Sequence, residues 1–186
     1  MITTEPPAAS TLPATLRRLY LGRFGFAVVW ALLVALVSPR SDALLTVLLV
    51  LYPLVDAASV YVELRASGSS ARSRLSERAN VALSVLAAVA LGWSALNSVG
   101  AVLTVWGVWA VVSGGTQLLT GIGRRRLGGQ WPLIVSGALS FLVGFGFIGQ
   151  GLGNATGLGP IAGYATLGGV FFLISAIRLG RTARAS

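Results

Sequence analysis

The chain has 186 residues, of which 55% are apolar and only 10% charged, whereas about a quarter of the residues of a typical soluble domain are charged. With a mean hydropathy of +0.82, a soluble chain this short could not bury its apolar surface, so lipid is the expected solvent. Histidine and cysteine are absent and all fourteen basic residues are arginine. This excludes disulfides, thiol chemistry, cysteine–histidine zinc sites and imidazole triads, and we expect no enzyme, metal or cofactor.

The first part of the chain is polar and then becomes apolar. Residues 1–16 contain three prolines and are expected to form a disordered cytoplasmic tail. An apolar segment follows at 19–37, with Arg23 about one turn inside it, where a long side chain can snorkel to the headgroups. A turn around Pro39 leads to the second apolar segment, 43–64.

The middle of the chain begins with a basic loop at 65–79, rich in serine and arginine. It precedes the shortest apolar segment, 80–96. A minimal turn at Asn97 and Ser98 then leads to the fourth segment, 99–122. The short third segment is the weakest of these predicted helices.

The last two apolar segments are 131–148 and 158–177. At roughly 17 to 24 residues, each of the six segments is long enough for a helix that crosses about 30 Å of hydrocarbon. The sequence therefore predicts an all-α polytopic membrane protein with six transmembrane helices in a single domain, 17–184. The helices are expected to form three tandem hairpins, at 19–64, 80–122 and 131–177.

The distribution of arginines predicts the orientation. Thirteen of the fourteen lie in the terminal regions or in the loops after the second and fourth segments, and only Arg40 lies on the opposite side. By the positive-inside rule both termini are expected to be cytoplasmic. Because the arginines mark segment ends, nucleic acid is not an expected partner. The expected partner is the bilayer, a homo-oligomer is compatible with the sequence, and no partner protein is indicated.

A short pattern recurs once in each expected hairpin: an aromatic residue, three mostly apolar residues, then a polar or small one. Its aromatic positions are Tyr52, Trp109 and Tyr164, at spacings of 57 and 55 residues. A period of this length is typical of a duplicated two-helix module.

Three hairpins that carry these segments resemble the HdeD-like family, short-repeat bacterial inner-membrane proteins linked to acid resistance. The resemblance covers residues 17–184 and rests on the segments 52–57 (YPLVDA), 109–114 (WAVVSG) and 129–140 (GQWPLIVSGALS). Two features depart from the family pattern: Ala57 stands where glycine usually follows the acidic residue, and Pro39 has no counterpart at Asn97 and Ser98. The resemblance implies a multi-pass protein of the bacterial plasma membrane, a role in acid or envelope stress, and no established catalytic residues.

Asp56 is the carboxylate that stands out, because it lies well inside an apolar segment. At 1.5 Å per residue it is about 21 Å from the outer end of its helix and about 12 Å from the inner end. Burial favours the neutral form of a carboxyl group, so Asp56 is a candidate proton-responsive residue. Glu63, on the same helical stripe, is a second candidate.

Both candidates have a purely structural alternative. Asp56 could simply hydrogen-bond a neighbouring helix through Ser113, Gln117 or Ser84. Glu63 lies close to the interface and to Arg65, as the solvated end of a helix often does.

Small residues recur at helical spacing in the fourth and fifth segments. A period of seven or four places them along one face of a helix, where they allow a second helix to approach closely. The predicted packing residues are Gly107, Gly114, Gly121, Ser136, Ser140 and Gly144.

Three functions remain open from the sequence. The first is a non-catalytic role in acid or envelope stress with Asp56 as the proton-responsive group. The second is a small transporter or channel, against which stands the lack of a second charge expected within the membrane. The third is a structural scaffold whose basic loops dock a cytoplasmic protein or anionic lipid.

Overall fold

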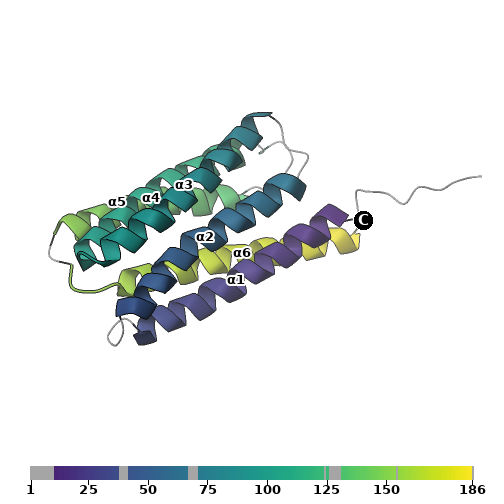
Figure 1. Cartoon of the computed structure of the whole chain (residues 1–186). Helices are drawn as coiled ribbons and strands as arrows, with labels where there is room; N and C mark the ends of the chain where they lie inside the picture. Colours follow the sequence, from purple (N-terminus) through teal and green to yellow (C-terminus); the bar gives the residue numbers. More distant parts are fainter. Residues whose placement is uncertain are drawn as a thin grey trace, which may run out of the picture.

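The computed structural model describes residues 11–37, 42–66, 71–123, 125, 131–153 and 155–185, and these form a helical bundle (Figure 1). The all-α class is confirmed over this part of the chain. The helices are α1 (Thr11–Val37), α2 (Asp42–Ala66), α3 (Ala71–Ala95), α4 (Val99–Gly123), α5 (Trp131–Leu152) and α6 (Gly159–Ala185).

All six helices are long and apolar enough to cross a membrane, with candidate spans of 22 to 25 residues. Only 22–39% of the residues in the most apolar part of each span are buried inside the bundle. Much of the outward surface is apolar; on α3, for example, Leu86, Val89 and Trp93 are 65%, 71% and 74% exposed. Lipid accommodates such a surface and water does not, so the fold is that of a multi-pass membrane protein.

Two helices begin earlier than the hydropathy pattern predicts. Helix α1 starts at Thr11 rather than at residue 19, so part of the expected tail 1–16 is helical, while residues 1–10 lie outside the described chain. Helix α3 starts at Ala71, so the expected loop 65–79 is largely helical. The reason is that arginine and glutamate favour helix although they lower hydropathy. The expected turn around Pro39 lies outside the described residues.

The closest helix pairs are α4 with α5, α1 with α6, and α2 with α3, whereas α5 and α6 share few contacts. The packing therefore does not follow the three tandem hairpins expected from the sequence. Instead α1 and α6 lie side by side along one side of α2, and α3, α4 and α5 lie on the other (Figure 1). We call α1 and α6 the terminal pair and α2 to α5 the four-helix unit.

The start of α1 and the end of α6 lie at the same end of the bundle (Figure 1). The side chain of Arg17 in α1 packs beside Gly180 in α6, where its Nε would be 3.0 Å from an added Cβ. An even number of crossings requires this arrangement.

An aromatic cluster joins α1, α2 and α4 in the core. Trp30 stacks on Trp106, with ring centroids 5.4 Å apart, and Tyr52 lies 4.6 Å from Trp30 and 5.3 Å from Trp106. Trp30 Nε1 donates to the carbonyl of Leu48 in α2 at 2.7 Å. This aromatic cluster forms one side of the polar region around Asp56.

Glycines bring α4 and α5 into backbone contact. At Gly107, an added Cβ would lie 2.6 Å from the carbonyl oxygen of Gly144. At Gly114, it would lie 2.6 Å from the amide nitrogen of Phe141. At Gly121 it would lie 2.8 Å from the side chain of Ile134. The predicted packing role of these three α4 glycines is thus what the structure shows.

On α5, Gly144, Ser140 and Gly137 face α4, and an added Cβ at Gly137 would lie 2.7 Å from Leu118 N. Gly137 was not among the predicted packing residues, and the packing role of Ser136 stays a prediction. Gly100 of α4 and Gly151 of α5 form a further close contact, which was not predicted. The glycines of α5 therefore repeat every seven residues, as those of α4 do, which matches the period of two closely packed antiparallel helices.

Candidate functional site

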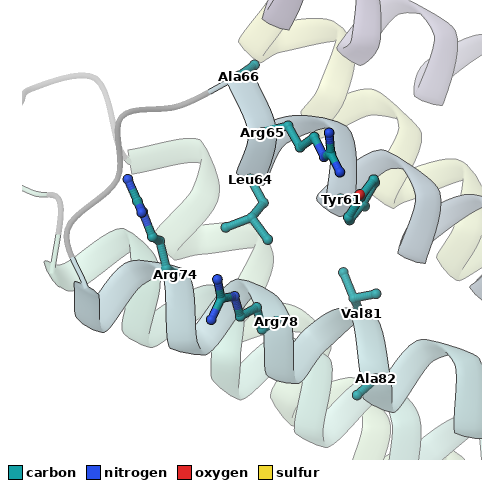
Figure 2. Close-up of a pocket in the computed structure, with 8 residues that line it drawn as sticks. All are labelled: Tyr61, Leu64, Arg65, Ala66, Arg74, Arg78, Val81 and Ala82. Atoms are coloured by element: carbon teal, nitrogen blue, oxygen red, sulfur yellow. The ribbon is translucent and has the colours of Figure 1, made fainter.

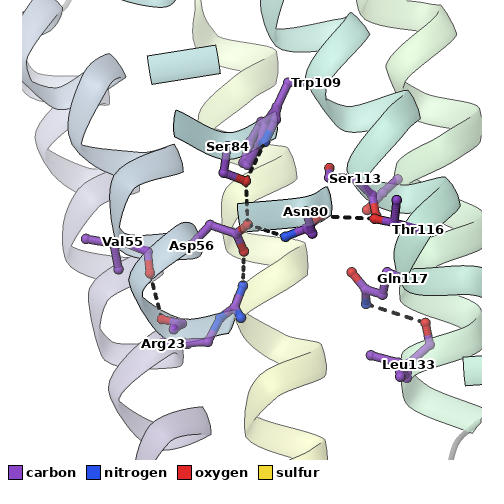
Figure 3. A network of polar contacts seen from close by, with 12 residues as sticks. Arg23, Val55, Asp56, Asn80, Ser84, Trp109, Ser113, Thr116, Gln117 and Leu133 are labelled. Atoms are coloured by element: carbon purple, nitrogen blue, oxygen red, sulfur yellow. Dashed lines mark hydrogen bonds and ion pairs between the residues drawn. The ribbon is translucent and has the colours of Figure 1, made fainter. Parts of the chain in front are cut away.

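Asp56 lies in the middle of α2 and faces the interior of the bundle, with 13% of its side chain exposed. A carboxylate in this position costs free energy unless it is paired and hydrogen-bonded. Its surroundings meet that requirement with donors from two neighbouring helices (Figure 3).

Both carboxylate oxygens of Asp56 have partners. Oδ1 forms an ion pair with Nη2 of Arg23 in α1. Oδ2 accepts hydrogen bonds from Asn80 Nδ2 at 3.1 Å and from Ser84 Oγ at 3.0 Å, both in α3. The carboxylate therefore connects three helices, α1, α2 and α3.

A second layer of contacts extends the network to α4. Trp109 Nε1 donates to Ser84 Oγ at 3.0 Å, and Thr116 Oγ1 donates to Asn80 Oδ1 at 3.1 Å. Because Ser84 and Asn80 each accept a hydrogen bond from α4, these two donors to Asp56 have fixed orientations. We call Arg23, Asp56, Asn80, Ser84, Trp109 and Thr116 the central network.

Arg23 does not snorkel to the headgroups as the sequence analysis expected. Its side chain is only 15% exposed, pairs with Asp56, and lies over the ring of Phe172 in α6, 3.9 Å from the centroid. Inside the bundle a carboxylate and an aromatic face replace the water that the guanidinium group loses. Arg23 is therefore a largely buried charge beside Asp56, which was not expected from the sequence.

Of the three partners expected for Asp56, only Ser84 is confirmed. Gln117 Nε2 donates instead to the carbonyl of Leu133, at 3.4 Å, and the carbonyl of Ser113 accepts from Thr116. Asn80 was missed because the predicted third helix began at that residue, whereas it lies well inside α3. Its spacing of four from Ser84, which puts both on one helix face, was the available signal.

Glu63, the second candidate, accepts a hydrogen bond from Tyr20 Oη at 3.2 Å. Glu63 lies seven positions after Asp56 in α2, and both side chains have a partner in α1, Tyr20 and Arg23 respectively. Glu77 in α3 is another buried carboxylate, 6% exposed. Glu77 was not among the candidate residues because it lies in the expected loop 65–79.

The central network holds one charge of each sign inside the bundle. The carboxylate of Asp56 balances the charge of Arg23 and accepts from two neutral donors. Without this carboxylate the guanidinium group would lie in a largely buried position without a counter-ion, so the contact between α1 and α2 depends on the ion pair.

No family model, no curated protein and no solved structure matches this chain. The function proposed below is therefore inferred from the contacts of the central network.

Ser84→Ala tests the second layer of the network. The change removes one donor to Asp56 and leaves the buried indole N–H of Trp109 without its acceptor, so the free energy of unfolding should fall by about 1–3 kcal/mol. Denaturant unfolding of the purified protein measures the loss. The matched control in the same helix is Ser94→Ala, because Ser94 Oγ donates only to the carbonyl of Leu91 at 3.1 Å. Equal losses in the two variants would show that the network adds nothing specific.

Proposed function

We propose that this chain is a non-catalytic, multi-pass membrane protein of the HdeD-like type that contributes to acid or envelope stress tolerance. In this proposal the ion pair of Arg23 and Asp56 is the proton-responsive element. The observation that carries the proposal is that a carboxylate in the middle of a membrane span holds α1 to α2 and α3.

The proposed response is a movement of the terminal pair relative to the four-helix unit. Helices α1 and α6 pack extensively on each other but less on α2 and α5. The contacts that hold the pair in place include the Arg23–Asp56 ion pair and a hydrogen bond of 2.9 Å from Tyr164 Oη to Ser140 Oγ. Loss of the ion pair removes a polar contact from an interface that also holds Trp30 against Tyr52 and Trp106. In this proposal such a local change biases the packing between two arrangements.

The charged and titratable groups around Asp56 come from four helices. Arg23 lies in α1, Tyr52 in α2 and Tyr164 in α6. Glu63 in α2 and Glu77 in α3 are further carboxylates on the helices that meet here. The ion pair with Arg23 needs the ionised carboxylate, so in this proposal acid breaks the pair by protonating Asp56.

The proposed location is the bacterial plasma membrane with both termini in the cytoplasm. The support is the arginine distribution in the sequence, since thirteen of the fourteen arginines belong to the terminal regions or to the basic stretches that follow the second and fourth apolar segments. Cytoplasmic loops of membrane proteins carry this excess of positive charge.

Asp56→Asn tests the function in cells. The amide has nearly the same shape but carries no charge, so the variant should accumulate normally and lose acid survival. Survival after an acid challenge, measured in a deletion strain complemented with each variant at equal protein level, gives the result. Glu63→Gln is the control and should retain survival.

If D56N does not accumulate, the double variant R23Q/D56N replaces it in the same assay. This variant leaves no charge in the central network. Wild-type survival with either variant at normal protein level would refute the proposed role.

A small transporter or channel is the second candidate, and one observation favours it. A line of polar side chains continues from Asn80 along α3 and α4: Ser76 Oγ donates to the carbonyl of Thr116 at 3.0 Å, and Thr120 Oγ1 donates to Ser76 Oγ at 2.9 Å. Polar groups aligned in this way within a membrane are typical of ion and proton paths. Proton flux into proteoliposomes that D56N abolishes would favour this candidate.

A further inference from the structure

A crevice of about 840 Å³ opens between the end of α2 and the beginning of α3. It is separate from the central network. Its lining residues, drawn in Figure 2, are Tyr61, Leu64, Arg65, Ala66, Arg74, Arg78, Val81 and Ala82. We propose that this crevice binds an anionic phospholipid.

Three arginines line the crevice from both of its walls. Arg65 comes from α2, and Arg74 and Arg78 come from α3, one turn apart on the same helix face (Figure 2). The guanidinium group of Arg65 lies over the ring of Tyr61, 5.0 Å from the centroid. Three planar cations around one space suit a phosphate, which arginine contacts with two parallel hydrogen bonds.

The depth of the arginines matches the headgroup layer. In the sequence Arg65 directly follows the apolar segment 43–64, and Arg74 and Arg78 precede the apolar segment 80–96. These arginines therefore lie where the two helices leave the hydrocarbon, which is the level of phospholipid phosphates.

The rest of the lining is apolar and points to a ligand with acyl chains. Leu64, Val81 and Ala82 line the crevice beside the arginines. Below them on α3, Val85 and Leu86 are 44% and 65% exposed, so the apolar surface continues toward the membrane interior. A soluble anion would use the arginines alone, whereas a phospholipid uses both parts of the surface.

The test is lipid binding to the purified protein in detergent, followed by native mass spectrometry. Phosphatidylglycerol should bind about tenfold or more tightly than phosphatidylcholine, because the arginines attract the anionic headgroup. The triple variant R65Q/R74Q/R78Q should lose this preference. Its matched control is R18Q/R125Q/R181Q, which removes three exposed arginines from the same end of the bundle but outside the crevice and should retain it.

Two results would overturn the proposal. Equal losses in the two triple variants would mean that the attraction comes from the net charge of +9 and not from the crevice. Displacement of phosphatidylglycerol by an equal concentration of glycerophosphate, which has the headgroup chemistry but no acyl chains, would assign the site to a soluble phosphate.

Discussion

Asp56→Leu is expected to lower the free energy of unfolding by about 3–5 kcal/mol, because it leaves the guanidinium group of Arg23 largely buried without its counter-ion. Arg23 is only 15% exposed, so water can compensate for little of the loss. Asn80 and Ser84 also lose their acceptor at Oδ2. Unfolding of the purified protein by a denaturing detergent, followed by tryptophan fluorescence, measures the change.

The double variant R23L/D56L tests whether the loss of stability in D56L comes from the unpaired charge of Arg23. It removes both charges, so no unpaired ion remains in the bundle, and apolar replacements of buried ion pairs are often neutral or stabilising. The double variant should therefore be clearly more stable than D56L. If its loss instead equals the sum of the two single losses, Arg23 and Asp56 do not interact energetically, and the network has been misassigned.

Gly114→Ala is expected to have the second large effect, a loss of about 1–3 kcal/mol or more from overpacking. The added Cβ would lie 2.6 Å from Phe141 N and 2.8 Å from the carbonyl oxygen of Gly137, both backbone atoms of α5. Neither can move without displacing the helix, so α4 and α5 must separate. The same unfolding assay measures the loss.

Gly115→Ala is the control for this prediction, one residue further along α4. There the nearest atoms to an added Cβ are in the ring of Phe141 at 3.7 Å and 3.9 Å, which is ordinary contact. Alanine favours helix over glycine by about 1 kcal/mol, so this variant should be neutral or slightly stabilised. Similar losses at both positions would contradict the close approach of the two helices.

The helical class and the six spans could be predicted from the sequence because lipid imposes a strong rule. Every span needs a long apolar helix, and the described part of the chain has six. Helix ends were predicted less well, since hydropathy marks the hydrocarbon boundary while helices continue beyond it. This is why Ala71 begins a helix within the expected loop.

Packing partners were harder to predict than the helices themselves. The period of seven at Gly107, Gly114 and Gly121 identifies a close-packed face, but it does not say which helix covers that face. The repeat in the sequence suggested neighbours within each hairpin, whereas α4 packs most extensively on α5. Gly137 also faces α4, and nothing in the sequence pattern singled it out.

The candidate site could be predicted in part. Asp56 was identifiable because a carboxylate in an apolar segment is costly, and Ser84 was among its expected partners. Arg23 was missed because an arginine near the start of a span can either snorkel or turn inward, and the choice depends on a partner 33 residues away in the sequence.

The central claim is that the Arg23–Asp56 ion pair holds the terminal pair of helices against the four-helix unit until Asp56 is protonated. The most direct test is the distance between the two parts, measured by double electron–electron resonance. The chain has no cysteine, so spin labels can be attached through V89C in α3 and L167C in α6, both at exposed positions. We expect the distance distribution to change between neutral and acidic pH, and D56N to show the acid distribution already at neutral pH. A single distribution that is unchanged by pH and shared by D56N would contradict the account.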